Sequence, residues 1–410
     1  MSNDCVPSFA NLLSREEIIR RLLENWTVER LTEEIPVEDA LGRIPAADVF
    51  SCLTLPLVRA SAGDGVAVSS ARFADGLPDT SQWTEGEDFV RADTGDDFSD
   101  AFDAVIMIED VELEPEGRLR ITGSPRVTPG MNIRGAGSAV RAGELLARAF
   151  LPLRPRDLAV LQMGGAEIIQ VIKKPVVAFI PTGSELIAPG TPLSRGKNID
   201  INSLLVRETL KGLGAEPLCF PIIKDRPQDL EKALDEALER ADIVIINGGS
   251  SKGEEDCNAT LLHQRGQVLC HGAQAVPGKP LCAAFIDGKP VINLPGPFLA
   301  TYHGLEWCVN AAVSHYLNQP RKRRRTVKAT LTRELRGSDT VSMLMMVDVT
   351  RKAGNDGFYA RPFSMREERG ARCAAANGQY MTKLGEYLSA GGEIEVELLR
   401  GVEYIPMEEE

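Results

Sequence analysis

From Pro175 onward, short apolar strands alternate with amphipathic helices, and this pattern restricts the fold more than any other feature of the chain. The helical segments are residues 202–214, ending at Gly212 or Gly214, and residues 225–241. The strands are residues 176–180 (VVAFI), 217–223 (PLCFPII), 242–246 (DIVII) and 289–294 (KPVINL). Strands without polar alternation are buried on both faces, so residues 175–320 are predicted to form a parallel sheet covered by helices.

The segments on either side of this α/β block have a different character. A capping box at residues 14–17 precedes apolar residues at helical spacing, which predicts an amphipathic helix, and residues 37–43 predict a second, short one. From residue 49 to residue 144, β-prone runs alternate with turn clusters, which indicates a small β-rich domain. Residues 321–410 contain alternating strands typical of a β-barrel or a sandwich.

The charge of the chain limits its partners. A formal net charge of −13 argues against non-specific binding of nucleic acid, which requires clustered positive charge. The basic run RKRRR at residues 321–325 is interpreted as a solvated linker at a domain boundary. A binding patch for an anionic ligand or partner is the alternative for this run.

Cysteine, histidine and hydropathy patterns predict a cytoplasmic protein that does not interact with membranes. None of the eight cysteines has CxxC spacing, which favours buried reduced thiols over a zinc cluster or a disulfide framework. The four histidines lack metal-ligand spacing and are interpreted as core or surface residues. The N-terminus shows no signal-peptide pattern, and no run of 18 apolar residues occurs.

Ligands of open parallel sheets bind beyond the carboxyl ends of the strands, so the loops at those ends are the candidate site. Gly248 and Gly249 would let a phosphate approach backbone amides, and Lys279 could add a positive charge. Carboxylates repel phosphate unless a hard divalent cation such as Mg²⁺ lies between them. The carboxylates in these loops are Glu185, Asp225 and Asp256. The loops therefore predict a phosphate-bearing ligand accompanied by Mg²⁺.

Each of these signals also has a structural interpretation. A Gly-Gly pair after a strand is commonly a tight turn, and Glu254 and Glu255 suit the first turn of a helix. Asp225 is a suitable N-cap for the following helix. Asp64 could belong to an Asp-Gly turn. Only the convergence of several signals at one sheet edge favours binding.

The motifs along the whole chain, in matching order, resemble those of the molybdopterin molybdenumtransferases, the MoeA family that includes the E domain of gephyrin. The most specific of them are PTGSEL, NGGSSKGEED and VPGKP in the α/β block, which also contains LPG at residues 294–296. The others are LPLVRASAGDGVAV at residues 55–68, ADTGDDFSDAFDAVIMIED at residues 92–110 and IDIN at residues 199–202. By this resemblance the chain is identified as a divergent member of that family.

The resemblance implies an elongated α/β plus β protein of four parts, assembled as a homodimer. These are a discontinuous helical/β linker domain (8–48 and 145–174), an inserted β-rich domain (49–144), a molybdopterin-binding α/β domain (175–320) and a C-terminal β-barrel (321–410). It also implies Mg²⁺-dependent insertion of molybdate into adenylylated molybdopterin, with release of AMP. Molybdopterin adenylyltransferase and apo-molybdoenzymes are the implied partners.

The resemblance also assigns roles to individual residues. The implied catalytic residues are Asp64, Glu185, Asp225 and Asp256, and the last three would bind the metal. Asp64 would reach in from the inserted domain, of the same or of the partner subunit. The implied substrate-binding residues are Thr94, Thr182, Gly248, Gly249, Ser251, Lys279, Pro295 and Gly296.

Several positions depart from the family pattern, and those in the VPGKP and PGPFLA loops lie where the resemblance places the handling of the oxyanion. Val276 replaces one of two lysines, Ser184 replaces an acid, and Phe298 and Ala300 stand in a loop that normally carries an amide and a hydroxyl. The remaining departures are Arg59, Ala60, Gly63, Ser138, Ala139 and Pro297. Three hypotheses therefore stay open: an active transferase for molybdate or tungstate, an altered paralogue that carries or senses the pterin or finished cofactor, and a structural protein.

Overall fold

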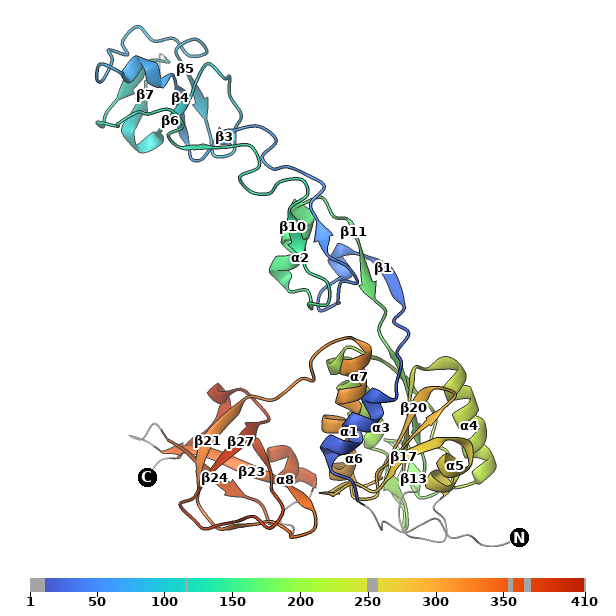
Figure 1. Cartoon of the computed structure of the whole chain (residues 1–410). Helices are drawn as coiled ribbons and strands as arrows, with labels where there is room; N and C mark the ends of the chain where they lie inside the picture. Colours follow the sequence, from blue (N-terminus) through green and yellow to red (C-terminus); the bar gives the residue numbers. More distant parts are fainter. Residues whose placement is uncertain (1–11, 115–116, 249–256, 353–356, 365–369, 409–410) are drawn as a thin grey trace. The chain divides into compact units, whose positions relative to one another are not determined.

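The computed structural model describes residues 12–114, 117–248, 257–352, 357–364 and 370–408 (Figure 1). The chain divides into two compact units, of which one comprises Met1–Arg30 with Lys173–Glu410 and the other Leu31–Ile172. The boundaries of the four predicted domains stay a prediction.

A six-stranded sheet with the order β15-β12-β16-β20-β19-β17 forms the centre of the first unit. Four neighbouring strands run parallel, which confirms the parallel core, and β19 and β17 extend it as antiparallel strands that were not predicted. Asp287 and Gly288, both with positive φ, form the tight turn that reverses the chain between β19 and β20. The strands are β12 (Val176–Pro181), β15 (Glu216–Cys219), β16 (Ile243–Asn247), β17 (Gln267–His271), β19 (Cys282–Ile286) and β20 (Lys289–Leu294).

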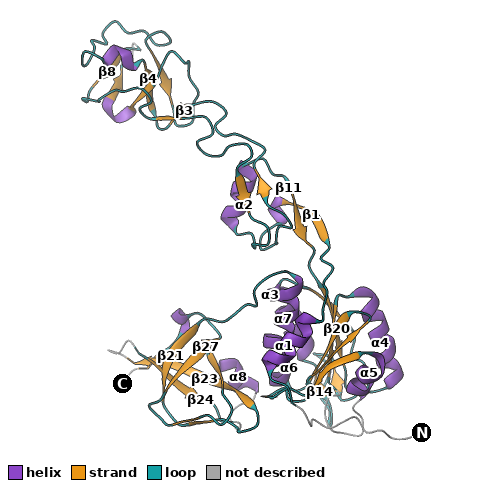
Figure 2. Cartoon of the chain, viewed as in Figure 1, coloured by secondary structure: helices purple, strands orange, loops and turns teal. Residues whose placement is uncertain are grey.

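Helices cover both faces of this sheet (Figure 2). On one face, α4 (Pro227–Arg240) and α5 (Cys257–Arg265) pack against β12, β16 and β19. The buried residues of α4 are those predicted from its spacing, namely Leu230, Ala233, Leu234, Ala237 and Leu238. The other face is covered by α1 (Arg15–Glu24), α3 (Asn202–Leu213), α6 (Phe298–Gly304), the π-helix η4 (Leu305–Val309) and α7 (Asn310–Tyr316).

The ends of the predicted helices are set by local chemistry. Ser14 caps α1, because its Oγ accepts the Glu17 N–H at 3.1 Å. The second of the two predicted ends of α3 is observed, since Gly214 adopts the left-handed conformation with φ of +91°. The helix predicted over residues 37–43 is shorter than expected: only the 3₁₀ turn η1 (Val37–Asp39) forms. Among the described residues, no helix has the length and apolar character required to cross a bilayer.

The C-terminal strands close into a barrel, which decides between the two predicted architectures. The pairings run β21–β24–β23–β25–β27 and return from β27 to β21. The barrel strands are β21 (Thr326–Leu331), β23 (Ser342–Lys352), β24 (Phe358–Pro362), β25 (Gly378–Met381) and β27 (Glu393–Leu398). Shorter elements accompany them: β22 (Leu335–Arg336), α8 (Gly370–Ala375), β26 (Tyr387–Leu388), η5 (Val402–Tyr404) and β28 (Met407–Glu408).

Contacts within the first unit join the barrel to the α/β sheet. Phe298, Leu299 and Tyr302 of α6 pack against a buried cluster of the barrel that includes Leu344 and Met346. Strand β18 (Ala275–Val276) pairs with β23. In the basic run, Lys322 Nζ donates to the carbonyl of Gly212 at 2.6 Å, and Arg324 pairs with Glu306 at 2.8 Å. The run is therefore partly anchored and not simply a solvated linker.

The second unit has the β-rich character that was predicted. In residues 49–144 the three-stranded antiparallel sheet β5-β4-β6 encloses a core containing Val66, Phe89 and Ile106. The strands of this stretch are β2 (Val49–Phe50), β3 (Ala60–Ser61), β4 (Gly65–Val68), β5 (Phe89–Ala92), β6 (Ala104–Met107), β7 (Val111–Leu113), β8 (Leu119–Ile121) and β9 (Ile133–Arg134), with the 3₁₀ turns η2 (Ser70–Phe73) and η3 (Ile108–Asp110). A separate core forms around β1 (Thr32–Pro36), β10 (Leu145–Ala147), α2 (Pro155–Met163) and β11 (Ile168–Ile172).

Candidate functional site

The loop that follows β12 holds the first predicted residues of the site. Gly183 has a φ of +155°, a backbone conformation that residues with a side chain rarely adopt, and it lies directly beside the Glu185 carboxylate. Thr182 is buried, and its hydroxyl donates to the carbonyl of Asn247 and accepts from Asn258 Nδ2, both at 3.1 Å. Glu185 therefore lies at the solvent surface of the sheet edge, whereas Thr182 lies beneath it.

Asp225, in the loop between β15 and α4, is bonded to the β12 loop. Its Oδ2 accepts the Ser184 backbone N–H at 2.7 Å, and its own N–H donates to Ser184 Oγ at 3.2 Å. The interpretation of Asp225 as the N-cap of α4 is wrong: Arg226 is the cap residue, and Pro227 has no amide to be capped. The reciprocal pair instead fixes the loop of Asp225 against the loop of Glu185.

An amide network that was not predicted lies under the strand ends. Asn247, the last residue of β16, is buried, and its Nδ2 donates to the carbonyls of Leu294 (3.2 Å) and Pro295 (3.1 Å) and to Thr301 Oγ1 (3.0 Å). Its Oδ1 accepts from Asn202 Nδ2 at 2.8 Å. Asn247 therefore ties the loop after β20 to the first turn of α3. In the sequence, the network was indicated only by Asn247 itself, a polar residue at the end of an apolar strand. Such a residue is equally compatible with a simple turn.

Asn202 has one buried polar atom for which the described residues provide no partner. Its Nδ2 donates to Asn247 Oδ1 and to the carbonyl of Gly296, both at 2.8 Å. Because both of these partners are acceptors, the orientation of the amide is fixed, and Asn202 Oδ1 forms no hydrogen bond within the described part of the chain. Buried polar atoms are nearly always paired, and exceptions call for a functional explanation. Asn202 is therefore added to the candidate site.

Gly248 lets the loop after β16 lie against Thr182, and Gly296 of the loop after β20 is its neighbour. Gly248 has a φ of +121°, and a Cβ atom on it would lie 2.5 Å from the carbonyl oxygen of Thr182. A Cβ atom on Gly296 would lie 3.7 Å from Gly248 Cα. The Gly248 N–H donates to the Leu294 carbonyl at 3.0 Å, so this amide is engaged within the protein.

The metal-binding prediction is only partly covered by the structure. Glu185 and Asp225 lie on the two loops that Ser184 joins. Gly249, Ser251 and Asp256 lie outside the described residues. Within the described part of the chain, no three His, Cys, Asp or Glu side chains are grouped so that they could hold a metal ion.

The VPGKP loop, which carries Lys279, is hydrogen-bonded to a buried histidine. The Val276–Pro277 peptide bond is cis, and the Lys279 side chain is exposed. His303 Nδ1 lies 2.7 Å from the Pro277 carbonyl oxygen, and the ring is buried. Burial lowers the pKa of His303 to about 4, so the ring is neutral at pH 7 and Nδ1–H donates to Pro277. Sequence analysis assigned no role to this histidine, which holds the loop of the predicted phosphate-binding lysine.

Asp64 and Thr94 belong to the second unit and contact each other there. Asp64 Oδ1 accepts the Thr94 backbone N–H at 2.7 Å and the Thr94 hydroxyl at 2.8 Å. These two bonds, the backbone one foremost, hold the pKa of Asp64 below its usual value. The interpretation of Asp64-Gly65 as a turn is wrong, because Gly65 is the first residue of β4.

Gly65 allows β4 to approach β6 next to Asp64. A Cβ atom on Gly65 would lie 2.0 Å from the carbonyl oxygen of Ile106, which is backbone and cannot move aside. Gly65→Ala is therefore expected to lower the free energy of unfolding of the second unit by about 1–3 kcal/mol, measured by chemical denaturation. Gly135→Ala is the matched control, because a Cβ atom there meets nothing within 4 Å. Equal loss of stability in the two variants would contradict this explanation.

The contact between Asp64 and Thr94 also predicts a pH dependence. A lowered pKa means that the contact is present above the ordinary titration range of aspartate and is lost as the pH falls through the lowered value. Thr94→Val removes the hydroxyl donor but keeps the backbone donor, so the pKa of Asp64 should rise part of the way toward its usual value. Carboxyl NMR titration measures this shift. An unchanged midpoint would mean that the hydroxyl bond is absent in solution.

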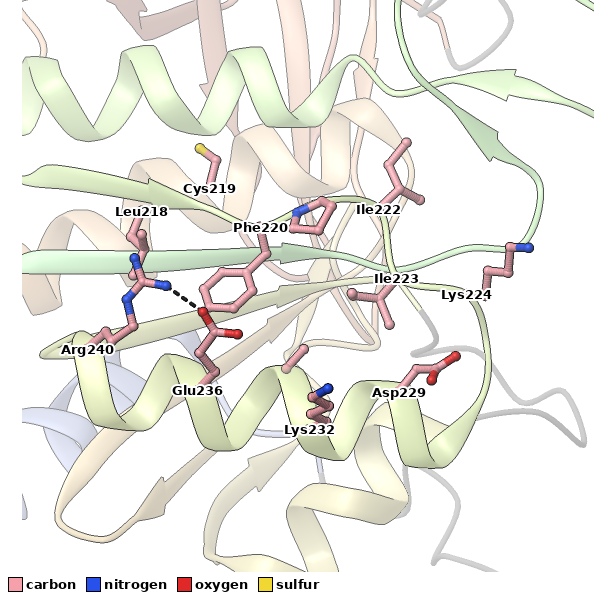
Figure 3. Close-up of a pocket in the computed structure, with 12 residues that line it drawn as sticks. Leu218, Cys219, Phe220, Ile222, Ile223, Lys224, Asp229, Lys232, Glu236 and Arg240 are labelled. Carbon is pink, nitrogen blue, oxygen red and sulfur yellow. Dashed lines mark hydrogen bonds and ion pairs between the residues drawn. The ribbon is translucent and has the colours of Figure 1, made fainter.

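A groove of about 410 Å³ lies beside the outer strand β15, between that strand and α4 (Figure 3). Phe220 points toward α4, where Arg240 is paired with Glu236. The Glu216 and Phe220 N–H groups bind β12, so Pro217 faces away from the sheet. Pro217, and Pro221 just beyond the strand, have no amide hydrogen, so the outer edge of β15 offers few donors to another strand.

Two protein-family models together match most of the chain. A family model described as "MoeA N-terminal region (domain I and II)" matches residues 13–165. A second, described as "Probable molybdopterin binding domain", matches residues 178–315. The second match contains the strand ends β12, β16 and β20, where the candidate site lies.

Individual relatives extend these matches. A molybdopterin molybdenumtransferase of Haemophilus influenzae is 30% identical over 297 residues, which cover 70% of this chain and 73% of the relative. One from Staphylococcus aureus is 28% identical over 393 residues, covering 91% and 92%. The crystal structure of a molybdopterin biosynthesis MoeA protein from Pyrococcus horikoshii superimposes with a TM-score of 0.78 at 25% identity, covering 95% of this chain and all of that one.

Proposed function

The chain belongs to the molybdopterin molybdenumtransferases, a family of enzymes, and from this we propose that it inserts molybdate into adenylylated molybdopterin and releases AMP. This is a step in the biosynthesis of the molybdenum cofactor. The reciprocal pair between Ser184 and Asp225, which fixes Asp225 beside the loop of Glu185, carries the proposal most directly. It provides two carboxylates at the edge where ligands of such sheets bind.

The carboxylates of this edge suit Mg²⁺. Glu185 and Asp225 are exposed, and a hard divalent cation prefers carboxylate oxygens. The Ser184 N–H is hydrogen-bonded to Asp225 Oδ2, and we assign Oδ1 of the same carboxylate to the ligand. We assign Glu185, Asp225 and Asp256 as the residues that would hold Mg²⁺. The bound ion would neutralise charge on the phosphoanhydride.

The remaining residues of the edge would bind and orient the substrate. Lys279 would contact a phosphate as a point charge, and His303 would hold its loop in place through Pro277. We assign Gly248 and Gly296, which carry no side chain, to contact with the ligand through their backbone. The substrate comes from an adenylyl transfer to molybdopterin, and the product is consumed by apo-molybdoenzymes.

We propose a homodimer in which Asp64 and Thr94 complete the site. The family resemblance supports the dimer, and the second unit exposes large apolar side chains that a partner subunit could cover. Those more than half exposed include Leu41, Phe50, Leu57, Leu151 and Ile168. The bonds from Thr94 keep Asp64 ionised and oriented, as a polar group that acts on a substrate requires.

An altered paralogue that carries or senses the pterin is the second candidate. It is favoured by Val276 and Ala139, and by Phe298, which packs against the barrel cluster instead of presenting a polar group. For this candidate, the residues that bind the pterin are retained, whereas those that bind molybdate are lost.

A single-turnover incubation distinguishes the two candidates. Purified protein is mixed with adenylylated molybdopterin, Mg²⁺ and molybdate, and the release of AMP and the loading of the pterin with molybdenum are followed together. Appearance of both products supports the transferase. Tight binding of the pterin without release of AMP would instead identify a carrier or sensor.

A further inference from the structure

Lys197 lies in the turn before β14 (Asn198–Ile199), next to the loop of Glu185. Its Nζ donates to the Ser184 carbonyl at 2.7 Å. The next residue, Asn198, donates its backbone N–H to the Glu185 carbonyl at 2.9 Å. The segment is tied further by the parallel pairing of β14 with β13 (Leu186–Ile187). Both the side chain and the backbone of this segment are therefore fixed against the Glu185 loop.

Ser184 links this lysine to the acidic side of the site. Its carbonyl binds the Lys197 ammonium, and its N–H binds Asp225 Oδ2 at 2.7 Å. A single peptide segment thus holds a cation on one side and a carboxylate on the other. Within the described part of the chain, Lys197 forms no ion pair with Glu185 or Asp225. Neither of these two described carboxylates therefore forms an ion pair with the ammonium.

The chemistry of the ammonium indicates what it binds. An ammonium has three N–H donors, and one of them is directed at Ser184. Among the described residues no hydrogen bond of the other two is found, and we assign them to oxygen atoms of a ligand. An exposed, anchored ammonium at the edge of the sheet suits a phosphate or pyrophosphate group, which accepts several charge-assisted bonds.

We propose that Lys197 is a phosphate-binding residue of this site and that it supplies a second positive charge in addition to that of Lys279. The inference rests on the proposed function, and it deepens it. The position that would carry a second lysine in the VPGKP loop is Val276, and Lys197 provides a cation from a different loop. The ligand class is a phosphoanhydride or a phosphate monoester.

The test measures binding to the full chain, without chemistry. Isothermal titration with AMP and with inorganic pyrophosphate, each with Mg²⁺, gives the affinity of wild type, Lys197→Met and Lys197→Arg. The methionine variant should bind about 10-fold more weakly, because it loses a charge-assisted bond. Its affinity should also depend less on salt. The arginine variant, which keeps the charge, should restore most of the binding.

Lys232→Met is the matched control, because Lys232 is also exposed but lies on α4 in the groove. It should bind both probes as wild type does. Unchanged affinity and salt dependence in Lys197→Met would overturn the proposal, and so would failure of wild type to bind either probe. A variant that is weak only because its loop is disturbed would lose affinity without losing salt dependence, which would also overturn it. If wild type binds the probes through Lys197 but releases no AMP in the single-turnover assay, the transferase proposal fails while this one stands.

Discussion

Asp225→Asn is expected to slow the release of AMP in a single turnover by about 100-fold or more. Asparagine keeps an acceptor for the Ser184 N–H, so the loop pair with Glu185 should persist. The charge that would neutralise Mg²⁺ is lost, and the affinity for the cation should fall with the rate. Raising the Mg²⁺ concentration should therefore recover part of the activity, which can be measured as a shift in the Mg²⁺ dependence.

Asp229→Asn is the matched control for this variant. Asp229 lies in the first turn of α4 and lines the groove beside β15, four residues from Asp225. Its loss should leave the rate within a few-fold of wild type. Similar rates for Asp225→Asn and wild type would show that this carboxylate does not serve the reaction, even though it is fixed beside Glu185.

The second large effect is expected at Asn247, which should determine the stability of the whole sheet edge. Asn247→Ala removes four hydrogen bonds and leaves the Asn202 amide and the Pro295 carbonyl with fewer buried partners. The free energy of unfolding of the first unit should fall by about 3 kcal/mol or more, because each buried polar group left unpaired costs about 1–3 kcal/mol. Chemical denaturation measures it.

A control for Asn247 comes from β14 on the same unit. Asn198 is exposed there, so Asn198→Ala should change the stability by about 0.5 kcal/mol or less. A double variant of Asn247 and Asn202 should lose less than the sum of the single losses, since the two amides share one bond. Additive losses would argue that the network is not cooperative.

The regular parts of the fold could be predicted because their patterns are local. The spacing of apolar residues in α4 identifies its buried face, and the uninterrupted apolar strands identify the parallel core. The antiparallel extension through β19 was missed, although the Asp287-Gly288 pair is a hairpin signal. The long apolar strand that follows this pair suited a parallel strand equally well.

The site was harder to predict from the sequence than the fold, because its geometry depends on residues distant in sequence. Asp225 has the right type and position for a helix cap, and only the approach of Ser184 from another loop gives its carboxylate a different partner. Asn247 and Asn202 meet across 45 residues, and nothing in either local sequence indicates that contact. His303 likewise supports Pro277 from a helix that follows a different strand.

Phe298 stands where the family resemblance predicts a polar residue, and its side chain has a packing role instead. Its ring packs with Leu299 and Tyr302 against the barrel residues Leu344 and Met346. A mutation that restored a small polar residue at position 298 would therefore open a gap in a buried cluster before it brought any catalytic benefit. A polar residue at position 298 would therefore have to be combined with larger side chains in the barrel that refill the gap. The loop after β20 and the barrel are thus linked, so a change designed in one of them has to be designed in both.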